Sequence, residues 1–232
     1  MKRLSLTVLL FFFLVLPTHI TAQNLSPEEA FRKSFPKQNF ESITPSPVKG
    51  IYEVYTGNQM FYFMPENEII ITGNLITKDG VNLTRESNLK IMAGKMEKLP
   101  LDWALKIGKG KTKVVEFTDP NCPYCRRAFD FFDGRKDVTL YVFLIPLSQD
   151  SEKKIKHIFC SKDKIKAYEN VMSGKLDNNA PLNICNDKEV DDRVRTHREL
   201  AAQAGVGATP TFFLKNTAVG GFEKNTLDQL LD

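Results

Sequence analysis

The sequence predicts two folded domains: a small α+β domain with an antiparallel sheet, and a larger α/β domain that carries a helical insertion. Three observations lead to this prediction. Short strand-like segments separated by turn residues fill residues 51–80, strands and helices alternate from residue 112 onward, and a helical stretch lies between these two regions. With 232 residues, of which 42% are apolar, the chain is long enough to form both cores.

The N-terminus has the features of a targeting segment. Two basic residues precede an apolar run from Leu4 to Leu16, which is followed by a short polar stretch. The run is shorter than the roughly 20 residues that span a bilayer, so we predict a secretory signal peptide over residues 1–22, cleaved near Ala22. An uncleaved membrane anchor is the alternative. Because no later run of residues is long and apolar enough to span a bilayer, we expect the mature protein not to be membrane-integral.

Residues 23–85 are expected to form an N-terminal dimerisation domain. In "SPEEAFRKSF" the order Ser26, Pro27, Glu29 predicts a capped helix start. The stretch "IYEVYTGNQMFYFMPENEIIITGNLITKDG" then holds three or four short strands rich in Ile, Val, Tyr and Phe. So thin a sheet should bury a face or an edge against something. A second copy of the chain is the simplest partner, which predicts a homodimer.

A linker helix is predicted over residues 86–108, with a break at Pro100, and the larger domain follows at 109–232. In that domain "TKVVEFTD" and "VTLYVFLIPL" read as buried strands, and "CPYCRRAFDFFDG" between them begins a helix. A helical insertion follows at about 151–204. The segment "ATPTFFLKNTAVGG" predicts two further short strands, and "NTLDQLL" a last helix.

All four cysteines follow the signal peptide, so export would bring them to a compartment that permits disulfides. Four cysteines allow three possible pairings. Cys122 lies at the start of the predicted helix, where free N–H groups and the helix dipole favour its thiolate. Cys125, one turn deeper, can close a small disulfide with it. Pro123 fits the first helical turn. This arrangement suits an exchange in which Cys122 attacks a substrate disulfide and Cys125 resolves the mixed disulfide.

Two other interpretations of Cys122 and Cys125 stay open at this point. A structural disulfide across three residues would be strained and easily reduced. Half of a zinc site is the second alternative, with His157 three residues before Cys160, but Cys160 and Cys185 do not form a second close pair. We therefore predict no metal and no cofactor.

Two further features lie near the cysteine pair. Thr209 and Pro210, in "GVGATPTFF", precede a strand-like run, and a proline there leaves neighbouring backbone groups free to bind an extended peptide. Glu116 lies in a predicted central strand, six residues before Cys122. As a buried acid it is a candidate proton relay for Cys125, with a solvated edge residue as the alternative.

Four stretches together carry a family resemblance. "FTDPNCPYC" followed by "GATPTFF" resembles the thioredoxin fold. With "ITPSPVKGIYEVYT" and "FCSKDKIKAYENVMSGK", the chain resembles the DsbC/DsbG family of periplasmic disulfide isomerases, and it is closer to DsbC. The resemblance spans nearly all of residues 40–230. It implies a V-shaped homodimer in the periplasm, with two thioredoxin-like arms facing an apolar cleft.

The resemblance also implies partners and residue roles. Its substrates would be misoxidised exported proteins, and a membrane reductant of the DsbD type would keep it reduced. Cys122 would be the nucleophile and Cys125 the resolving thiol. Thr209-Pro210 would form the cis-proline loop. A structural disulfide would join the two remaining cysteines, Cys160 and Cys185, and close a loop of 25 residues worth about 3 to 4 kcal/mol.

The chain departs from the DsbC pattern at two positions: Pro123 stands where the family usually has Gly in the Gly-Tyr pair between the cysteines, and Glu116 lies six residues before Cys122. The two residues between the cysteines tune the stability of the thiolate and so the reduction potential, and the Pro-Tyr pair therefore leaves the balance between isomerase and oxidase open. We therefore predict an isomerase, with a net dithiol oxidase or reductase for a narrower client set, or a holdase-type chaperone, as alternatives. A net charge of +4 without a basic cluster argues against nucleic acid. Tyr124 is expected to be exposed, and His157 and His197 to lie at the surface.

Overall fold

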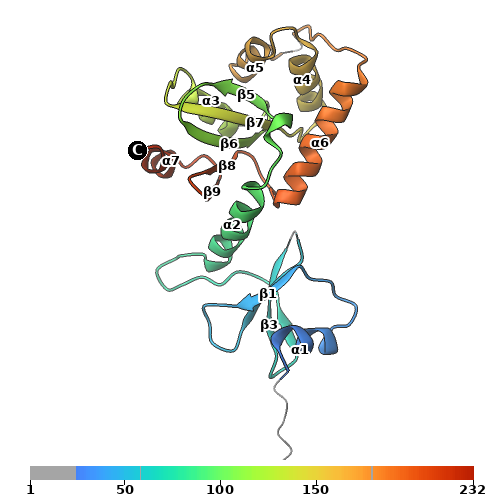
Figure 1. Cartoon of the computed structure of the whole chain (residues 1–232), viewed down its shortest axis with the longest axis vertical. Helices are drawn as coiled ribbons and strands as arrows, with labels where there is room; N and C mark the ends of the chain where they lie inside the picture. Colours follow the sequence, from blue (N-terminus) through green and yellow to red (C-terminus); the bar gives the residue numbers. More distant parts are fainter. Residues whose placement is uncertain (1–24, 58, 179) are drawn as a thin grey trace, which may run out of the picture.

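The computed structural model describes residues 25–57, 59–178 and 180–232, so the predicted signal peptide over residues 1–22 lies outside the described part. A small N-terminal domain and a larger C-terminal domain are joined by helix α2 (Leu83–Met96) (Figure 1). Among the helices of the described residues, none has the length and apolar character needed to span a bilayer.

The N-terminal domain is a four-stranded antiparallel sheet with one helix packed against it. The strands β1 (Ser42–Pro45), β2 (Tyr52–Tyr55), β3 (Met60–Met64) and β4 (Ile69–Ile71) follow one another in chain order across the sheet. Helix α1 (Pro27–Ser34) starts with the predicted capping box. It buries Phe31 against aromatic rings of the sheet. The sheet is only one layer thick, and within the chain both β1 and β4 are edge strands.

The predicted linker helix over 86–108 is wrong in its second half. Helix α2 begins after the cap residue Asn82 and ends at Met96, and Leu101–Trp103 forms a single 3₁₀ turn. Leu105–Gly108 is instead strand β5, which pairs with β7 at the edge of the large sheet. The physical reason is the break at Pro100, after which apolar and polar residues alternate with the period of a strand.

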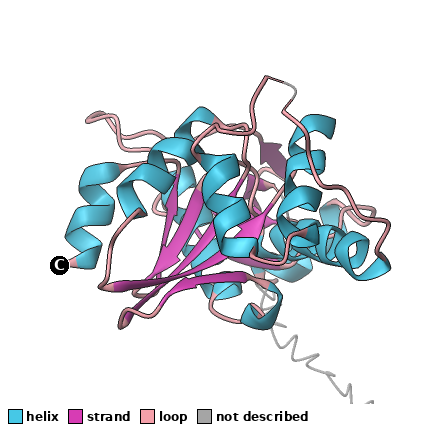
Figure 2. Ribbon diagram, turned by 90° about the horizontal axis from the view of Figure 1, so that it is seen from above, coloured by secondary structure: helices cyan, strands magenta, loops and turns pink. Residues whose placement is uncertain are grey.

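The C-terminal domain is a five-stranded mixed sheet in the order β5-β7-β6-β8-β9. Strands β6 (Thr112–Thr118) and β7 (Val138–Leu144) are parallel, whereas β8 (Thr211–Leu214) and β9 (Thr217–Gly220) run antiparallel to their neighbours. Helices pack on the sheet, as Figure 2 shows from above. One face contacts α3 (Pro123–Phe132), α4 (Gln149–Cys160), α5 (Lys164–Met172) and α7 (Lys224–Leu231), and the other face contacts α2 and the end of α6 (Lys188–Ala204).

Strand β6 is the central strand on which the functional loop depends. Its side chains alternate between the two cores: Val114 faces the α3 side, whereas Val115 and Phe117 face the α2 side. The same alternation points Glu116 and Thr118 toward α3. Both are fully buried, so the alternative of a solvated Glu116 is wrong.

His197 is not at the surface, contrary to the sequence-based expectation. It is fully buried, and its ring packs against Phe143 and Phe159. Its Nδ1 accepts the N–H of Leu144 at 2.9 Å, so its Nε2 carries the proton and donates to the carbonyl of Trp103 at 2.8 Å. Burial lowers the pKa of His197 to about 4. The expectation failed because the charged residues of α6 occupy its outer side, whereas His197 shares the inner side with the buried apolar residues.

Candidate active site

The two cysteines of interest lie at the start of α3, directly after the turn that follows β6. Cys122 is the N-cap residue of the helix and Pro123 is its first residue, as predicted. Both Cys122 and Cys125 are free thiols, the first half-buried and the second fully buried. Tyr124 between them is 56% exposed, which confirms its predicted exposure. Cys122 is therefore partly accessible to solvent, whereas Cys125 is not.

The Thr209-Pro210 loop lies against the outer cysteine, although 87 residues separate the two in sequence. The peptide bond between Thr209 and Pro210 is cis. The thiol of Cys122 donates to the carbonyl oxygen of Thr209 at 3.5 Å. The predicted pair of segments is thus brought together, and β8 begins directly after the loop.

The inner thiol, that of Cys125, is buried in the core of the C-terminal domain. The sulfur of Cys125 accepts a hydrogen bond from the backbone N–H of Asp119 at 3.4 Å. Burial raises the pKa of Cys125 to about 12, and the hydrogen bond from the backbone N–H of Asp119 opposes this effect only in part. A thiol of this kind reacts as a nucleophile only if a nearby base takes its proton.

Glu116 is the acidic group on the same side of the sheet. Burial raises its pKa to about 7, and the proximity of the Thr118 hydroxyl offsets this only in part. Among the described residues, neither carboxylate oxygen of Glu116 has a hydrogen-bond partner of good geometry, and neither does the hydroxyl of Thr118. A carboxyl group with this pKa can both accept and release a proton near neutral pH.

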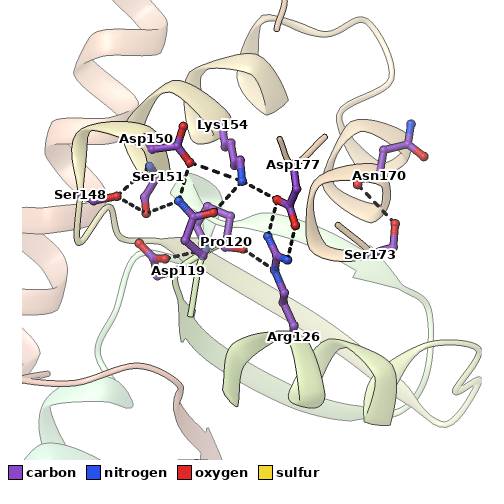
Figure 3. A network of polar contacts seen from close by, with 11 residues as sticks. Asp119, Pro120, Arg126, Ser148, Asp150, Ser151, Lys154, Asn170, Ser173 and Asp177 are labelled. Atoms are coloured by element: carbon purple, nitrogen blue, oxygen red, sulfur yellow. Dashed lines mark hydrogen bonds and ion pairs between the residues drawn. The ribbon is translucent and has the colours of Figure 1, made fainter. Parts of the chain in front are cut away.

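A polar network fixes the turn that carries Cys122 (Figure 3). The two carboxylate oxygens of Asp119 accept the backbone N–H groups of Asn121 at 2.7 Å and Leu147 at 2.8 Å. Arg126, on α3, donates from Nε to the carbonyl of Pro120 at 2.8 Å. The turn is therefore stabilised by contacts with the segment after β7 and with α3, the helix that follows the turn.

The helical insertion supplies the other half of this network. Asp177 accepts two hydrogen bonds from Arg126, at 2.6 and 2.8 Å, and a third from Lys154 at 2.6 Å. Lys154, whose side chain is 6% exposed, also donates to the side-chain oxygen of Asn121 at 2.7 Å. These charge-assisted contacts hold the pKa of Asp177 well below its usual range, with Arg126 the larger cause and Lys154 the next. Sequence reasoning did not identify these residues, because nothing in their spacing links them.

Cys160 and Cys185 form a disulfide, as the family resemblance implied. It joins the end of α4 to the loop before α6 and encloses the segment that carries Asp177. Since these two cysteines bond to each other, they do not complete a zinc site with Cys122 and Cys125. Within the described residues, no group of three His, Cys, Asp or Glu side chains is arranged to hold a metal ion.

Comparisons with known proteins match both domains. The model of the disulfide bond isomerase protein N-terminal domain matches residues 19–85, and that of the thioredoxin-like domain matches residues 100–232. The chain is 33% identical over 196 residues to the probable thiol:disulfide interchange protein DsbC of Bordetella avium, covering 82% of this chain and 68% of that protein. It is 31% identical over 207 residues to DsbC of Escherichia coli K12, covering 84% and 83% of the two chains.

A solved structure has a similar fold over part of the chain. The thiol-disulfide exchange protein alpha-DsbA2 from Wolbachia pipientis superposes with a TM-score of 0.52, at 16% identity, over 63% of this chain and 97% of that one. At this identity the likeness concerns the fold alone. Sequence identity over most of both chains is the stronger finding, and from it we conclude that the chain belongs to the DsbC family of thiol:disulfide interchange proteins.

Proposed function

We propose that this protein is a thiol–disulfide isomerase that rearranges wrong disulfides in exported proteins. The observation that carries the proposal is the pairing of a half-buried thiol at a helix N-terminus with a fully buried thiol three residues later. Beside them, the cis-proline loop contacts the outer sulfur. Such an arrangement forms a mixed disulfide at one atom and keeps the resolving atom away from solvent.

The proposed reaction begins when the thiolate of Cys122 attacks one sulfur of a substrate disulfide. A bond forms between Cys122 and that sulfur, and the other substrate sulfur leaves as a thiolate. In isomerisation a different substrate thiolate then attacks the same substrate sulfur and releases Cys122. If no such thiolate is in reach, Cys125 attacks Cys122, the Cys122–Cys125 disulfide forms, and the substrate leaves reduced. In this second route Glu116 takes the proton of Cys125.

The proposal includes a homodimer, a location and a redox partner. The N-terminal domain has an open edge strand, β4, in which Ile69 and Ile71 are exposed, and this supports pairing with a second copy. The predicted signal peptide supports export to the periplasm. Since resolution by Cys125 oxidises the enzyme, a membrane reductant of the DsbD type would have to return it to the dithiol.

Replacing both active cysteines tests the proposed function. The variant Cys122→Ala/Cys125→Ala should lose the ability to refold scrambled ribonuclease, because no mixed disulfide can form. It should still suppress aggregation of an unfolded client, since the apolar surfaces remain. Full refolding activity in the double variant would refute the thiol mechanism and leave the holdase-type chaperone.

The Pro-Tyr pair between the cysteines is the specific observation that favours a second candidate, a net oxidase or reductase. The reduction potential of the Cys122–Cys125 pair separates the candidates. Equilibration with glutathione buffers measures it directly. A pair that is mostly dithiol at the poise of its compartment suits isomerisation, whereas a strongly oxidising pair that stays in the disulfide form suits an oxidase.

A further inference from the structure

Asn121 lies directly before Cys122, in the turn that connects β6 to α3. The backbone N–H of Cys122 donates to the carbonyl of Asp119 at 3.2 Å, so residues 119–122, the active turn, form a hydrogen-bonded turn with Asn121 at its third position. The backbone N–H of Asp119 in turn donates to the sulfur of Cys125 at 3.4 Å. The conformation of this one turn therefore sets the positions of both thiols.

The side chain of Asn121 anchors the active turn on α4. Its Nδ2 donates to Oδ2 of Asp150 at 2.8 Å and to the hydroxyl of Ser151 at 3.2 Å. Its Oδ1 accepts a hydrogen bond from Nζ of Lys154 at 2.7 Å. An ammonium group can only donate and an ionised carboxylate can only accept, so these partners fix which way the amide points. An aspartate here would set a carboxylate against that of Asp150, and an alanine would supply neither a donor nor an acceptor.

Lys154 connects this anchor to the rest of the polar network. Its side chain is only 6% exposed, and it also donates to Asp177 at 2.6 Å. Arg126 donates to Asp177 as well, and from Nε to the carbonyl of Pro120. Figure 3 shows Lys154 from α4 and Arg126 from α3 converging on Asp177. Two successive residues of the turn are thus held from different helices, Pro120 from α3 and Asn121 from α4.

We propose that Asn121 is a positioning residue for the reaction of Cys122, and that Lys154 is the group that holds it in place. The inference rests on the proposed thiol exchange and deepens it. In the attack, the thiolate of Cys122 forms a bond to one substrate sulfur and the bond between the two substrate sulfurs breaks. The other substrate sulfur leaves with the electron pair and takes up a proton. The attacking sulfur must approach along the substrate bond, so a small displacement of the turn slows this step.

The same turn sets how readily the two thiols join. The outer sulfur donates to the carbonyl of Thr209 at 3.5 Å, and the inner sulfur accepts the N–H of Asp119. A turn released from α4 would sample further positions, and fewer of them would bring the two sulfurs together. We therefore expect removal of the anchor both to slow attack by Cys122 and to destabilise the Cys122–Cys125 disulfide.

The test uses the full chain with Asn121→Ala and, from the other end of the same hydrogen bond, Lys154→Met. Methionine keeps most of the lysine stem and leaves Asp177 paired with its arginine. In each variant the rate at which reduced Cys122 attacks a model peptide disulfide should fall about ten- to a hundred-fold. The equilibrium constant for forming the Cys122–Cys125 disulfide in a glutathione buffer should fall about ten-fold.

Asn183→Ala is the matched control. Asn183 belongs to the same helical insertion, and its Nδ2 donates to the carbonyl of Cys160 at 3.3 Å, at the opposite end of α4 from Asp150. Loss of this bond should leave the attack rate and the glutathione equilibrium at their wild-type values. The control thus separates positioning of the thiol from a general loss of stability, and near-ultraviolet circular dichroism confirms that each variant is folded.

The double variant Asn121→Ala/Lys154→Met tests whether the two residues act together. It should react no more slowly than Asn121→Ala, because both substitutions remove the same hydrogen bond. Losses that multiply would overturn the assignment of Lys154 as the group that holds Asn121. A wild-type rate and equilibrium in folded Asn121→Ala would overturn the whole inference while the proposed function stands. A wild-type protein that forms no mixed disulfide at Cys122 would instead overturn the proposed function.

Discussion

At the scale of single residues, burial of the Glu116 carboxyl group costs folding free energy, and the same group is the proposed proton acceptor for Cys125. A neutral glutamine keeps its shape but cannot take a proton from Cys125. We therefore expect Glu116→Gln to slow resolution of mixed disulfides by about ten- to a thousand-fold, and to let them accumulate at Cys122. Stopped-flow kinetics with a preformed mixed disulfide measures this rate. Kinetics equal to wild type would mean that Glu116 plays no part in the proton transfer.

The same residue predicts how stability depends on pH. Well below pH 4.5 Glu116 is protonated in the folded and the unfolded chain alike. As the pH rises from 4.5 through about 7, the unfolded chain ionises first while the folded chain keeps its proton, so stability falls by about 3 kcal/mol. Glu116→Gln should remove this fall and be more stable than wild type above pH 7. Urea unfolding at a series of pH values measures it, and parallel curves for both proteins would contradict it.

Residue chemistry was predictable where it depends on local spacing. Cys122 and Cys125 at a helix start, and Glu116 in a run of strand residues, are visible in one short stretch. Asp177 was not, because it meets Arg126 from 51 residues away. His197 was misjudged for a related reason: charged neighbours in sequence say little about which side of a helix a single residue occupies.

At the scale of elements, the helical insertion stabilises the active turn through Asp177. Its replacement by alanine would leave Arg126 half-buried and Lys154 buried without their shared carboxylate. Because unpaired buried charges are costly, we expect Asp177→Ala to lower the free energy of unfolding by about 2 to 4 kcal/mol. The depressed pKa of Asp177 gives the sign with pH. The stabilisation is present above its ordinary pKa of 3.8 and is lost as the pH falls below it.

A surface ion pair provides the matched control for this prediction. Asp192 pairs with Arg195 at 2.7 Å on the exposed side of α6, where the arginine side chain is 61% exposed. Asp192→Ala should change stability by less than about 0.5 kcal/mol. Denaturant unfolding of both variants at neutral pH makes the comparison. Equal losses of unfolding free energy in the two variants would mean that the Asp177 network contributes no more to stability than a surface ion pair.

Element boundaries were the weaker part of the sequence-based prediction, again for a physical reason. Most strands of the two sheets and the capped helix α1 follow local patterns and were found, whereas β1 (Ser42–Pro45), which precedes the predicted strands at 51–80, was missed. Strand β5 was missed as well, since Leu105–Gly108 is only four residues long and is a strand only because β7 pairs with it. Tertiary pairing, rather than local preference, decides the structure of so short a segment.

At the scale of the whole molecule, the open edges of the small sheet differ. Strand β1 ends at Pro45, and a proline removes one backbone donor from that edge. Strand β4 consists of three isoleucines, and two of them, Ile69 and Ile71, are 46% and 38% exposed. Long exposed apolar side chains on an unpaired strand favour association with another strand. Of the two edges, β4 is therefore the one that suits a second copy of the chain.

Replacing Ile69 and Ile71 by lysine tests this assignment. Both side chains lie on the same face of β4, so antiparallel pairing of two copies would bring four lysines together across the dimer axis. Like charges opposed on neighbouring strands destabilise their pairing. We expect Ile69→Lys/Ile71→Lys to be monomeric by light scattering, to keep disulfide reductase activity and to lose most isomerase activity. The control is Ile165→Lys on α5, an isoleucine of similar exposure, 40%, which should stay dimeric. A wild-type protein that is itself monomeric would refute the dimer, whereas a double variant that stays dimeric would move the interface away from β4.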